Sequence, residues 1–537
     1  MPKTLDLKGF FGTYVEVISM EKQTEIIQQL QDKCSSLEQK VTRLEQENKL
    51  LKEHHRLNQY KQFGCSSEIT SDQMQLFNEA EKEADTSSKE PKMETITYNR
   101  RKEKGQRDIQ LEGLPEEIVE HRLSPGEQVC TCCGEDLHEM STEERRELKI
   151  VPATVSVVKH KRYVYACRRC DKEGTTTPIV TASMPNPVLP GSVVSPTALA
   201  HIMTQKYLDA QPLYRQEKQL ERLGIKLSRQ TMSNWMIQGA ERWLTPLYDK
   251  MHELLIDHDI LHADETNLQV LKENGRKATS KSYLWLYRTG GESDFPIVLY
   301  DYRTTRASKH PIKFLSGFQG YIHVDGYPGY HDIPNVKLSG CLSHVRRKFD
   351  EALKALPENE KDAQVAANQG LEFCNQLFAI ERKLKDKTPE ERHKIRHEYS
   401  FPIVEEFLDW LKQQKSKALP KSSFGKAINY CLNQWHKLIV FLEDGRLEID
   451  NNRAERSIKP FVIGRKNWLF SNTPKGAKSS ATIYSIIETA KENNLNPFAY
   501  LTHLFEKLPN IELEDQSAID ELLPWSESIP PKCKLEK

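Results

Sequence analysis

The chain of 537 residues is too long for one hydrophobic core, and at roughly 150 residues per domain it predicts three or four units. Lysine plus arginine and aspartate plus glutamate both number 77, so the net charge gives no direct sign of a nucleic-acid partner. No stretch reaches the roughly 18 apolar residues of a membrane helix, and the N-terminus lacks the long apolar run of a signal peptide. These features exclude a membrane protein and predict a cytoplasmic one.

A leucine heptad follows an N-terminal extension of residues 1–19 and predicts a coiled coil over residues 20–60. Asn48 falls at an a position of the heptad, where asparagine pairs best across a parallel dimer. The alternative is an amphipathic helix packed on its own chain. We expect a homodimer or higher oligomer. The d positions of the heptad are all leucine: Leu30, Leu37, Leu44 and Leu51.

Residues 61–115 are polar and rich in turn-forming residues, which predicts a linker. The basic run between Arg100 and Arg107 either contacts phosphate or is simply solvated.

Two Cys-x-x-Cys pairs lie in residues 116–180 and predict a zinc-binding module. Four thiolates in this pattern can hold one structural Zn²⁺ ion tetrahedrally. The alternative is a set of unliganded buried cysteines. The expected ligands are Cys130, Cys133, Cys167 and Cys170. Strands are expected between the pairs, at residues 149–151, 155–158 and 163–165.

Residues 186–250 are predicted to be helical, with a helix-turn-helix pattern over residues 213–237. Gly224 provides the turn, and Ser228 can cap the second helix. The exposed face of that helix either reads DNA or is the outside of an ordinary helical core. The candidate DNA-contacting side chains are Arg229, Gln230, Ser233 and Asn234.

The hydrophobic pattern then changes to that of strands, and residues 251–350 are predicted as the first part of a catalytic core. A helix at 308–318 precedes the fourth strand, and another helix begins near Ser343. Three meandering strands, a helix, a strand and a helix form the order of the ribonuclease H-like fold. The expected strands are 260–264, 283–287, 297–300, 321–325 and 336–342.

The remaining chain is predicted to be mainly helical. Residues 351–445 form a charged helical insertion, and residues 446–480 form the second part of the core. Helices follow at 481–510, and residues 511–537 are expected to be a frayed acidic tail. The predicted fold class is thus multidomain α+β: a coiled coil, a zinc module, a helical region, a ribonuclease H-like domain with a helical insertion, and C-terminal helices.

Three carboxylates from separate elements are the candidate catalytic residues. Asp264 and Asp325 stand at the ends of apolar strands, and Glu455 lies at the predicted start of a helix. Such carboxylates can hold two Mg²⁺ (or Mn²⁺) ions that act on a phosphodiester, although single aspartates at strand ends are often turn residues. His262 and His323, two residues before each aspartate, are either metal ligands of a metallohydrolase or buried core residues.

Basic side chains accompany Glu455 and predict contact with phosphate. The first group lies on the same helix and comprises Arg456, Lys459, Arg465 and Lys466. A second basic helix, which begins near Ser343, contributes Arg346, Arg347 and Lys348.

The ordered set of motifs resembles the transposases of the insertion sequence 66 family. The resemblance runs from about Glu21 to Leu508 and includes the zipper and the cysteine-rich module. Cys132 and Arg453 depart slightly from the family's motifs, and neither touches the three carboxylates. The further matching motifs are Lys61-Gln-Phe-Gly-Cys-Ser-Ser-Glu68, Ala263-Asp-Glu-Thr, Asp325-Gly-Tyr-Pro-Gly-Tyr, His344-Val-Arg-Arg-Lys-Phe, Asp450-Asn-Asn-Arg-Ala-Glu-Arg and Ile463-Gly-Arg-Lys-Asn-Trp-Leu-Phe470.

The resemblance implies a DDE transposase that acts on double-stranded DNA at the nucleoid. A 3′-OH is freed at each element end by hydrolysis and then attacks target DNA. Asp264, Asp325 and Glu455 fall on the family's catalytic carboxylates, and small accessory proteins of the same element are implied as partners. The alternatives are a metal-dependent nuclease without strand transfer and a DNA-binding or regulatory protein without catalysis.

Overall fold

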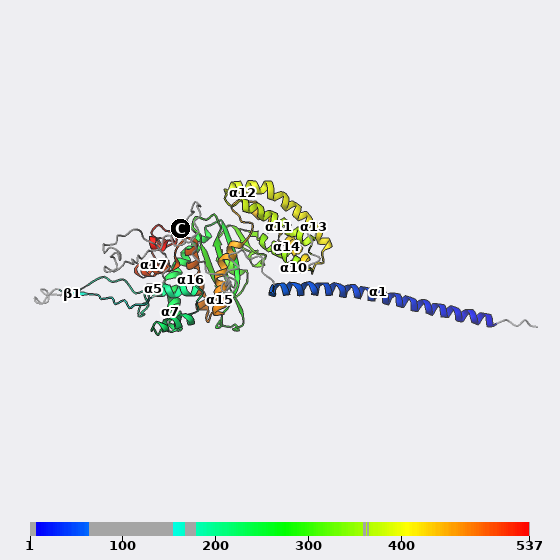
Figure 1. Cartoon of the computed structure of the whole chain (residues 1–537), viewed down its shortest axis with the longest axis horizontal. Helices are drawn as coiled ribbons and strands as arrows, with labels where there is room; N and C mark the ends of the chain where they lie inside the picture. The colour runs from blue at the N-terminus through cyan, green and yellow to red at the C-terminus, as the bar shows by residue number, and fades with distance from the viewer. Residues whose placement is uncertain (1–6, 64–153, 167–178, 358–360, 362–364, 536–537) are drawn as a thin grey trace, which may run out of the picture. The chain divides into compact units, whose positions relative to one another are not determined.

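The protein is seen in a computed structural model (Figure 1). Its contacts divide the chain into two units, residues 1–65 with 160–537 and residues 66–159. Most of the second unit, the four expected zinc ligands and nearly all of the expected linker lie outside the described residues. None of the described helices is long and apolar enough to cross a membrane. The structure describes residues 7–63, 154–166, 179–357, 361 and 365–535.

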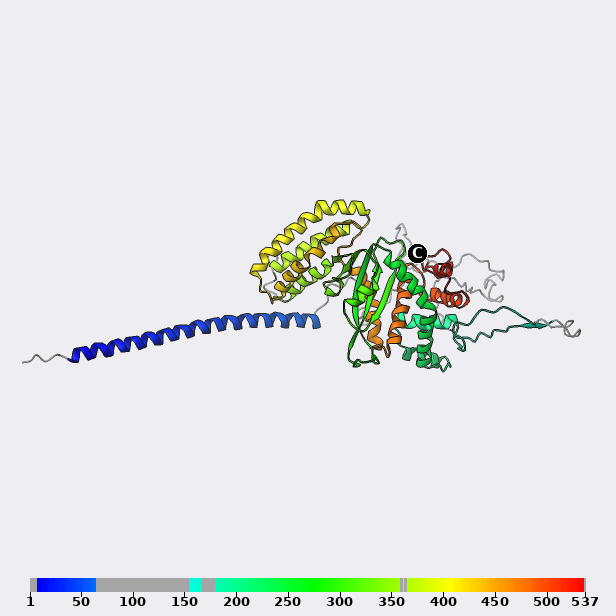
Figure 2. The same ribbon diagram turned by 180° about the vertical axis from the view of Figure 1, so that it is seen from behind.

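A mixed five-stranded sheet gives the first unit its mixed α/β character (Figure 2). The spatial order of its strands is β5-β4-β3-β6-β7. Strands β3, β4 and β5 pair antiparallel, whereas β6 runs parallel to both β3 and β7. All five expected strands are therefore confirmed. Their bounds are Ile260–Gln269 (β3), Lys281–Thr289 (β4), Val298–Arg303 (β5), Gly320–Val324 (β6) and Val336–Gly340 (β7). A short helix, α9, precedes β6 at Lys309–Phe314.

Two helices pack on this sheet, and Figure 2 shows them in orange: α15, Asn452–Trp468, and α16, Pro474–Glu492. Helix α16 also completes the hydrogen bonds of the outer strand β5. Thr489 Oγ1 donates to the carbonyl of Val298 (3.0 Å), and Ser485 Oγ accepts from the N–H of Tyr300 (2.8 Å). Because an outer strand exposes unpaired backbone groups, these buried hydroxyls close that edge of the sheet.

A helical region lies between β7 and α15 and has its own hydrophobic core, which includes Phe349 and Phe407. Its buried Arg396 pairs with Glu381 (2.7 Å) and donates to the carbonyl of Leu447 (2.9 Å). This arginine therefore ties the helical region to the segment that leads into α15. The helices are α10 (Leu342–Lys354), α11 (Ala366–Lys383), α12 (Pro389–Ile395), α13 (Phe401–Lys417) and α14 (Ser423–Leu438).

The expected helix-turn-helix pattern is confirmed as two helices. Gly224 lies in the turn with φ of +83°, a conformation that glycine adopts without strain. Ser228 caps the second helix by accepting from the N–H of Thr231 (3.2 Å), and Arg229 and Asn234 are exposed on it. The helices of this region are α5 (Pro196–Tyr207), α6 (Leu213–Arg222), α7 (Arg229–Gly239) and α8 (Thr245–Ile256).

The heptad lies on one long helix, α1, which spans Leu7–Phe63. It begins ahead of the expected Met20, and no proline interrupts the chain between Pro2 and Pro91. The four d-position leucines are between 49% and 69% exposed, so they do not pack on this chain as an amphipathic helix would.

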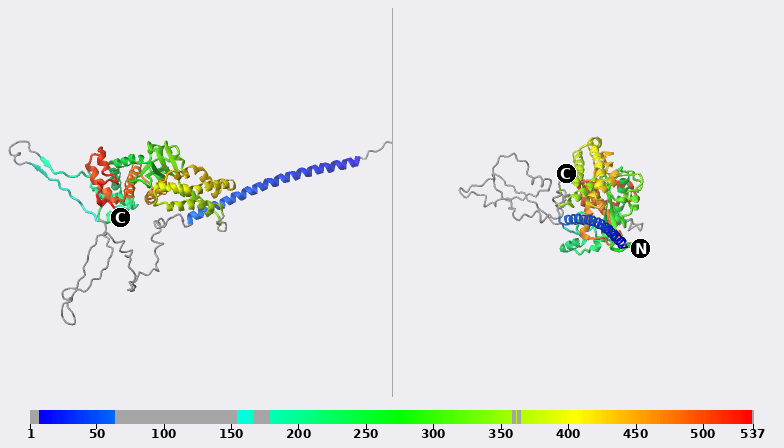
Figure 3. Two further views of the ribbon diagram at one scale, coloured as in Figure 1. Left: turned by 90° about the horizontal axis from the view of Figure 1, so that it is seen from above. Right: turned by 90° about the vertical axis from the view of Figure 1, so that its right-hand side faces the viewer.

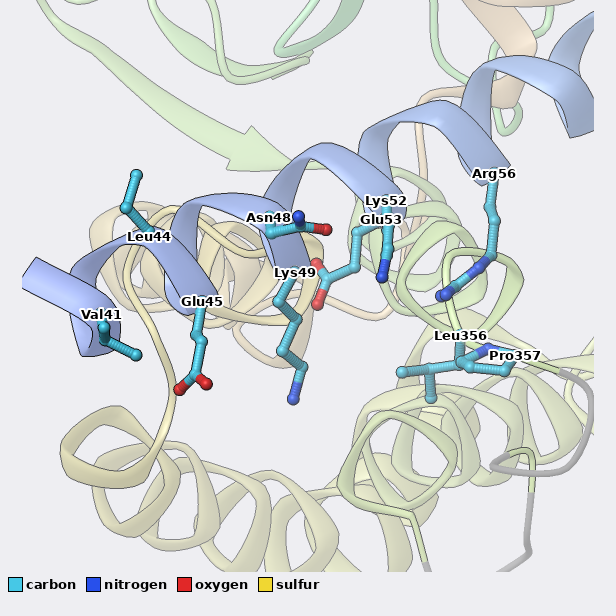
Figure 4. Close-up of a pocket in the computed structure, with 10 residues that line it drawn as sticks. All are labelled: Val41, Leu44, Glu45, Asn48, Lys49, Lys52, Glu53, Arg56, Leu356 and Pro357. Carbon is cyan, nitrogen blue, oxygen red and sulfur yellow. The ribbon is translucent and has the colours of Figure 1, made fainter.

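The last turns of α1 differ from this exposed heptad, and Figure 4 shows them beside Leu356 and Pro357. Arg56 Nη1 donates to the carbonyl of Ala355 (3.0 Å), and the side chain of Glu53 is buried. The contacts of α1 with the helical region thus lie near the C-terminal end of α1.

The C-terminal segment is packed, and the expectation of a frayed tail is wrong. Helix α17 (Pro497–Lys507) lies along α5, and Figure 3 shows this red segment against the neighbouring helices. Beyond it, α18 spans Gln516–Asp520, and the backbone N–H of Asn496 donates to the carbonyl of Cys533 (2.8 Å). Apolar side chains spaced among the acidic residues bury this segment; they are Ile519, Leu522, Leu523 and Ile529.

Only part of the strand expectation near the zinc module is confirmed. β1 (Val164–Ala166) pairs antiparallel with β2 (Ile179–Thr181), in agreement with the strand expected at 163–165. Residues 155–158 form no strand, so that expectation is wrong, and Val157 and Val158 are exposed. The strand expected at 149–151 lies outside the described residues.

Candidate active site

Two aspartates come together where β3 and β6 run parallel. His262 pairs with His323 in the register of these strands, so Asp264 and Asp325 occupy equivalent positions two residues further along. Each carboxylate accepts a nearby backbone N–H at 2.8 Å: Asp264 from Glu265, and Asp325 from Tyr327. Sheet register and local hydrogen bonds therefore set the positions of both groups.

The two histidines form a buried stack beneath these aspartates. The rings of His262 and His323 lie 4.2 Å apart at 12°, and both are fully buried. Burial lowers the pKa of His262 to about 3 and that of His323 well below its usual value, so both are neutral. Among the described residues, neither belongs to a group of three metal-type ligands. They are core residues, as the second of the two alternatives predicted.

Asn451 joins the start of α15 to the sheet. Its Oδ1 lies 2.9 Å from His262 Nδ1, and its Nδ2 donates to the carbonyl of Ala263 (2.9 Å). Its backbone N–H donates to Cys341 Sγ (3.2 Å) at the start of α10. This buried amide therefore fixes the first turn of α15, which carries Glu455, against β3 and α10.

The sequence predicts Asp450, just before Asn451 and Asn452, as the N-cap of this helix, but the structure places the N-cap one position later. The N-cap is Asn451, whose side chain is engaged with the sheet. Asp450 still accepts from the N–H of Asn452 (3.0 Å), and it also accepts from Ser343 Oγ (3.1 Å). Its carboxylate is thus held at the junction of α10 and α15.

Glu455 faces α10 from the first turn of α15. Its Oε1 lies 3.8 Å from His344 Nδ1, and its Oε2 lies 3.7 Å from Arg347 Nη2. Cys341, His344 and Glu455 are the one group among the described residues whose three ligand atoms all lie within 4.8 Å of one another. The structure therefore does not gather Glu455, Asp264 and Asp325 as tightly as it gathers Glu455 with α10.

Electrostatic interactions nevertheless link the three carboxylates. Burial raises the pKa of Asp264 well above the usual range of an aspartate. The charge of Glu265 raises this pKa further, and so do the charges of Asp325 and Glu455. Carboxylates that repel one another favour a bound cation, and oxygen is the ligand that Mg²⁺ prefers. The donor set at this place thus fits a divalent cation.

A buried ion pair that the sequence did not reveal supports this acidic centre. The side chain of Glu265 is 1% exposed and accepts from Arg306 Nε (2.7 Å) and from the Tyr330 hydroxyl (2.5 Å). Arg306 also stacks 3.6 Å from the ring of Tyr327, which follows Asp325 closely in the chain. The pair therefore fastens the loop after β6 to β3.

Two of the basic residues expected at DNA are engaged within the chain. Arg465 Nη1 donates to Thr266 Oγ1 (3.1 Å), and Arg346 Nε donates to Asn375 Oδ1 (3.0 Å). These arginines hold the end of β3 and helix α11, respectively.

The other basic residues lie closer to the acidic centre or at the surface. Arg347 contacts Glu455, and Lys348 Nζ lies 4.6 Å from the ring centre of Tyr430. Lys459 is half-buried on α15. The exposed members of the set are Arg456 and Lys466 on α15 and Arg229 on α7.

The class of protein follows from the comparisons with known families. A model described as "Transposase IS66 family" matches residues 191–479, which contain the sheet and all three carboxylates. The chain therefore belongs to the insertion sequence 66 family of transposases. Models described as "zinc-finger binding domain of transposase IS66", "Transposase C of IS166 homeodomain" and "IS66 C-terminal element" match residues 127–171, 50–119 and 485–525.

Two similar proteins come from Sinorhizobium fredii (strain NBRC 101917 / NGR234). "Uncharacterized protein y4jD" is 30% identical over 417 residues, which cover 75% of this chain and 79% of that protein. "Uncharacterized protein y4qI" is 30% identical over 426 residues, which cover 76% of each.

Proposed function

We propose that this transposase cleaves DNA at the ends of its insertion sequence and joins the freed 3′ ends to target DNA. The observation that carries the proposal is the placement of three carboxylates. Asp264 and Asp325 share one register at the end of β6, and Glu455 starts the helix that Asn451 joins to β3. The negative charges of Asp325 and Glu455 both contribute to the raised pKa of Asp264.

The catalytic domain in this proposal is ribonuclease H-like, with residues 351–445 as an insertion between its two parts. The strand order β5-β4-β3-β6-β7 supports it, with antiparallel pairing on one side of β3 and parallel pairing on the other. Hydrophobic side chains of residues 342–449 form a core distinct from that of most of the sheet, which supports the assignment of an insertion.

Asp264, Asp325 and Glu455 would hold two Mg²⁺ or Mn²⁺ ions. Bound ions supply activation of an attacking oxygen and stabilisation of the leaving oxygen at a phosphodiester. The chain's own residues position the ligands: Asn451 holds the turn that carries Glu455, and the Glu265–Arg306 pair holds the loop after Asp325. Arg347 beside Glu455 places a positive charge where a DNA phosphate would approach.

The DNA interface in this proposal extends from Arg347 to basic residues of two helices. Arg456 and Lys459 follow Glu455 on α15, and Arg229 begins α7, the second helix of the helix-turn-helix pattern. A helix in that position reads the major groove in many DNA-binding proteins.

The outer parts of the chain complete the proposal. The exposed heptad leucines of α1 support a coiled-coil dimer that brings two DNA ends together, with small accessory proteins of the element as further partners. Cys130, Cys133, Cys167 and Cys170 would hold one Zn²⁺ ion. Metal analysis of the purified chain should find zinc, and a Cys167→Ser variant should contain less zinc than the unmodified chain.

The proposed function can be tested by incubating the full chain with labelled element-end DNA, a target plasmid and Mg²⁺. Cleavage at the end, followed by covalent joining of the labelled 3′ end to the plasmid, would support it. Cleavage without joining would instead identify a nuclease, and binding without cleavage would identify a DNA-binding or regulatory protein. Either of these results would overturn the proposal.

A further inference from the structure

The start of α10 forms a second cluster of ligand atoms beside the carboxylates. Cys341 Sγ, His344 Nδ1 and a carboxylate oxygen of Glu455 all lie within 4.8 Å of one another. Cys341 and His344 are three residues apart, so one turn of α10 presents both of them toward Glu455 on α15. Two helices that Asn451 ties together therefore supply the three groups.

Two of these three atoms are available as metal ligands. His344 Nδ1 and Glu455 Oε1 are screened from solvent, and neither has a hydrogen-bond partner among the described residues. They face each other at 3.8 Å, which is too long for a hydrogen bond. Ligand atoms about 2.0–2.3 Å from a tetrahedral Zn²⁺ ion lie about 3.3–3.8 Å apart, so this separation suits a shared ion.

The types of ligand point away from magnesium. Sulfur and imidazole nitrogen bind Zn²⁺ and similar transition metals well, whereas Mg²⁺ prefers oxygen and keeps its water. Cys341 is buried, but the side chains of His344 and Glu455 are about one quarter and one third exposed, which leaves an open side for solvent. Binding would release the Cys341 thiol proton to the buffer.

We propose that Cys341, His344 and Glu455 bind a transition-metal ion of the Zn²⁺ class, and that this ion withdraws Glu455 from the Mg²⁺ set. The second half rests on the proposed function, because it requires Glu455 to be a Mg²⁺ ligand. The consequence is that Zn²⁺ inhibits cleavage by competing for one shared carboxylate. The first half, that the three residues bind a transition-metal ion, does not depend on the proposed function.

Titration of the full chain with Co²⁺, after purification with zinc and removal of exchangeable zinc by dialysis against a chelator, tests the site without an activity assay. Thiolate-to-cobalt absorption should appear with one Co²⁺ per chain and vanish in Cys341→Ser. His344→Ala should raise the Kd for Co²⁺ at least tenfold, and it serves as the test if Cys341→Ser does not fold. The matched control is Cys34→Ser, which removes an exposed cysteine of α1 and should leave the absorption unchanged.

Absence of the absorption in the unmodified chain, or its full retention in both site variants, would overturn the proposed site. Competition is tested by repeating the titration with excess Mg²⁺, which should raise the Kd for Co²⁺ in the unmodified chain but not in Glu455→Gln. If Mg²⁺ has no effect, the shared use of Glu455 is overturned while the Co²⁺ site stands. Failure of DNA cleavage would overturn the proposed function and leave the Co²⁺ spectrum intact.

Discussion

The two sides of the candidate active site are built differently. On the sheet side, strand register places Asp264 and Asp325, and the buried Glu265–Arg306 pair fastens the adjoining loop. On the helix side, Glu455 is about one third exposed, and its carboxylate oxygens lie 3.7 Å from Arg347 Nη2 and 3.8 Å from His344 Nδ1, beyond hydrogen-bonding distance. The side-chain amide of Asn451 connects the two sides near the carboxylates, through His262 and the carbonyl of Ala263.

This difference indicates how the site can be both rigid and adjustable. The sheet side costs folding free energy to disturb, because removing Arg306 would leave the buried Glu265 carboxylate without its cationic partner. The helix side is held by weak, partly exposed contacts, so the side chain of Glu455 is less constrained than those of the sheet carboxylates. Removing contacts on the sheet side should therefore affect folding, and removing them on the helix side should affect chemistry.

The largest effect on folding is expected from Arg306→Ala on the sheet side. The change leaves the Glu265 carboxylate buried with the Tyr330 hydroxyl as its remaining side-chain donor. Loss of one partner of a buried pair costs about 3–5 kcal/mol, and the partial exposure of Arg306 places the expected loss near the lower end. Chemical denaturation measures it, with the exposed Arg222→Ala as control. A loss below about 1 kcal/mol would show that the pair does not hold the sheet side.

Asn451→Ala tests the connection between the two sides. His262 and the Ala263 carbonyl would lose a buried partner, which costs about 1–3 kcal/mol. The neighbouring Asn452→Ala is the matched control, since Asn452 is less buried and its side chain bonds to Asp450 and Ser343 at the surface of the junction. Equal losses in the two variants, measured by denaturation, would contradict a special role for Asn451.

Arg347→Ala addresses the helix side, where the expected effect on folding is small. The ion pair with Glu455 is partly exposed, so its loss should change the unfolding free energy by less than about 0.5 kcal/mol. Cleavage of element-end DNA should nevertheless fall at least tenfold, because a charge that faces phosphate is lost. The control is Arg382→Ala on the exposed end of α11. Unchanged cleavage would remove Arg347 from the DNA interface.

The smallest effect on folding is expected on α1, whose heptad leucines are exposed. Leu44→Lys should leave the unfolding free energy of the rest of the chain unchanged and weaken dimerisation at least tenfold, because a charge would enter the d layer. Leu223→Lys is the matched control, since Leu44 and Leu223 are 49% and 48% exposed. Sedimentation of the full chain measures dimerisation in both variants, and chemical denaturation measures their unfolding free energy. A monomeric unmodified chain would contradict the dimer.

The sheet side was largely predictable from the sequence. Short apolar runs predicted every strand of the sheet. Asp325 directly follows β6, as expected, whereas Asp264 lies within β3, which continues beyond the expected end to Gln269. The pair between Glu265 and Arg306 was not predictable, because its partners are 41 residues apart and meet through the fold of the loop after β5. The misplaced cap at Asp450 has a similar cause: Asn451 takes the N-cap position while bonding to a strand 188 residues away.

The C-terminal segment shows another limit of pattern reading. Ile519, Leu522 and Leu523 lie among acidic residues, so the mean hydropathy of the whole segment resembles that of a solvated tail. They are nevertheless buried, because contacts with earlier elements rather than local periodicity bury this segment. The cluster at Cys341 was likewise hidden, although the three-residue spacing to His344 on a helix was a signal that could have found it.

The central claim, that Glu455 is the third catalytic carboxylate, is tested most directly by Mg²⁺-dependent cleavage of end DNA by two variants. Glu455→Gln removes a charge without removing volume, so it should abolish cleavage and leave end binding nearly intact. Asp450→Asn keeps an oxygen that can accept from Ser343 and the N–H of Asn452, so it should retain much of the activity. An active Glu455→Gln together with an inactive Asp450→Asn would contradict the assignment of Glu455.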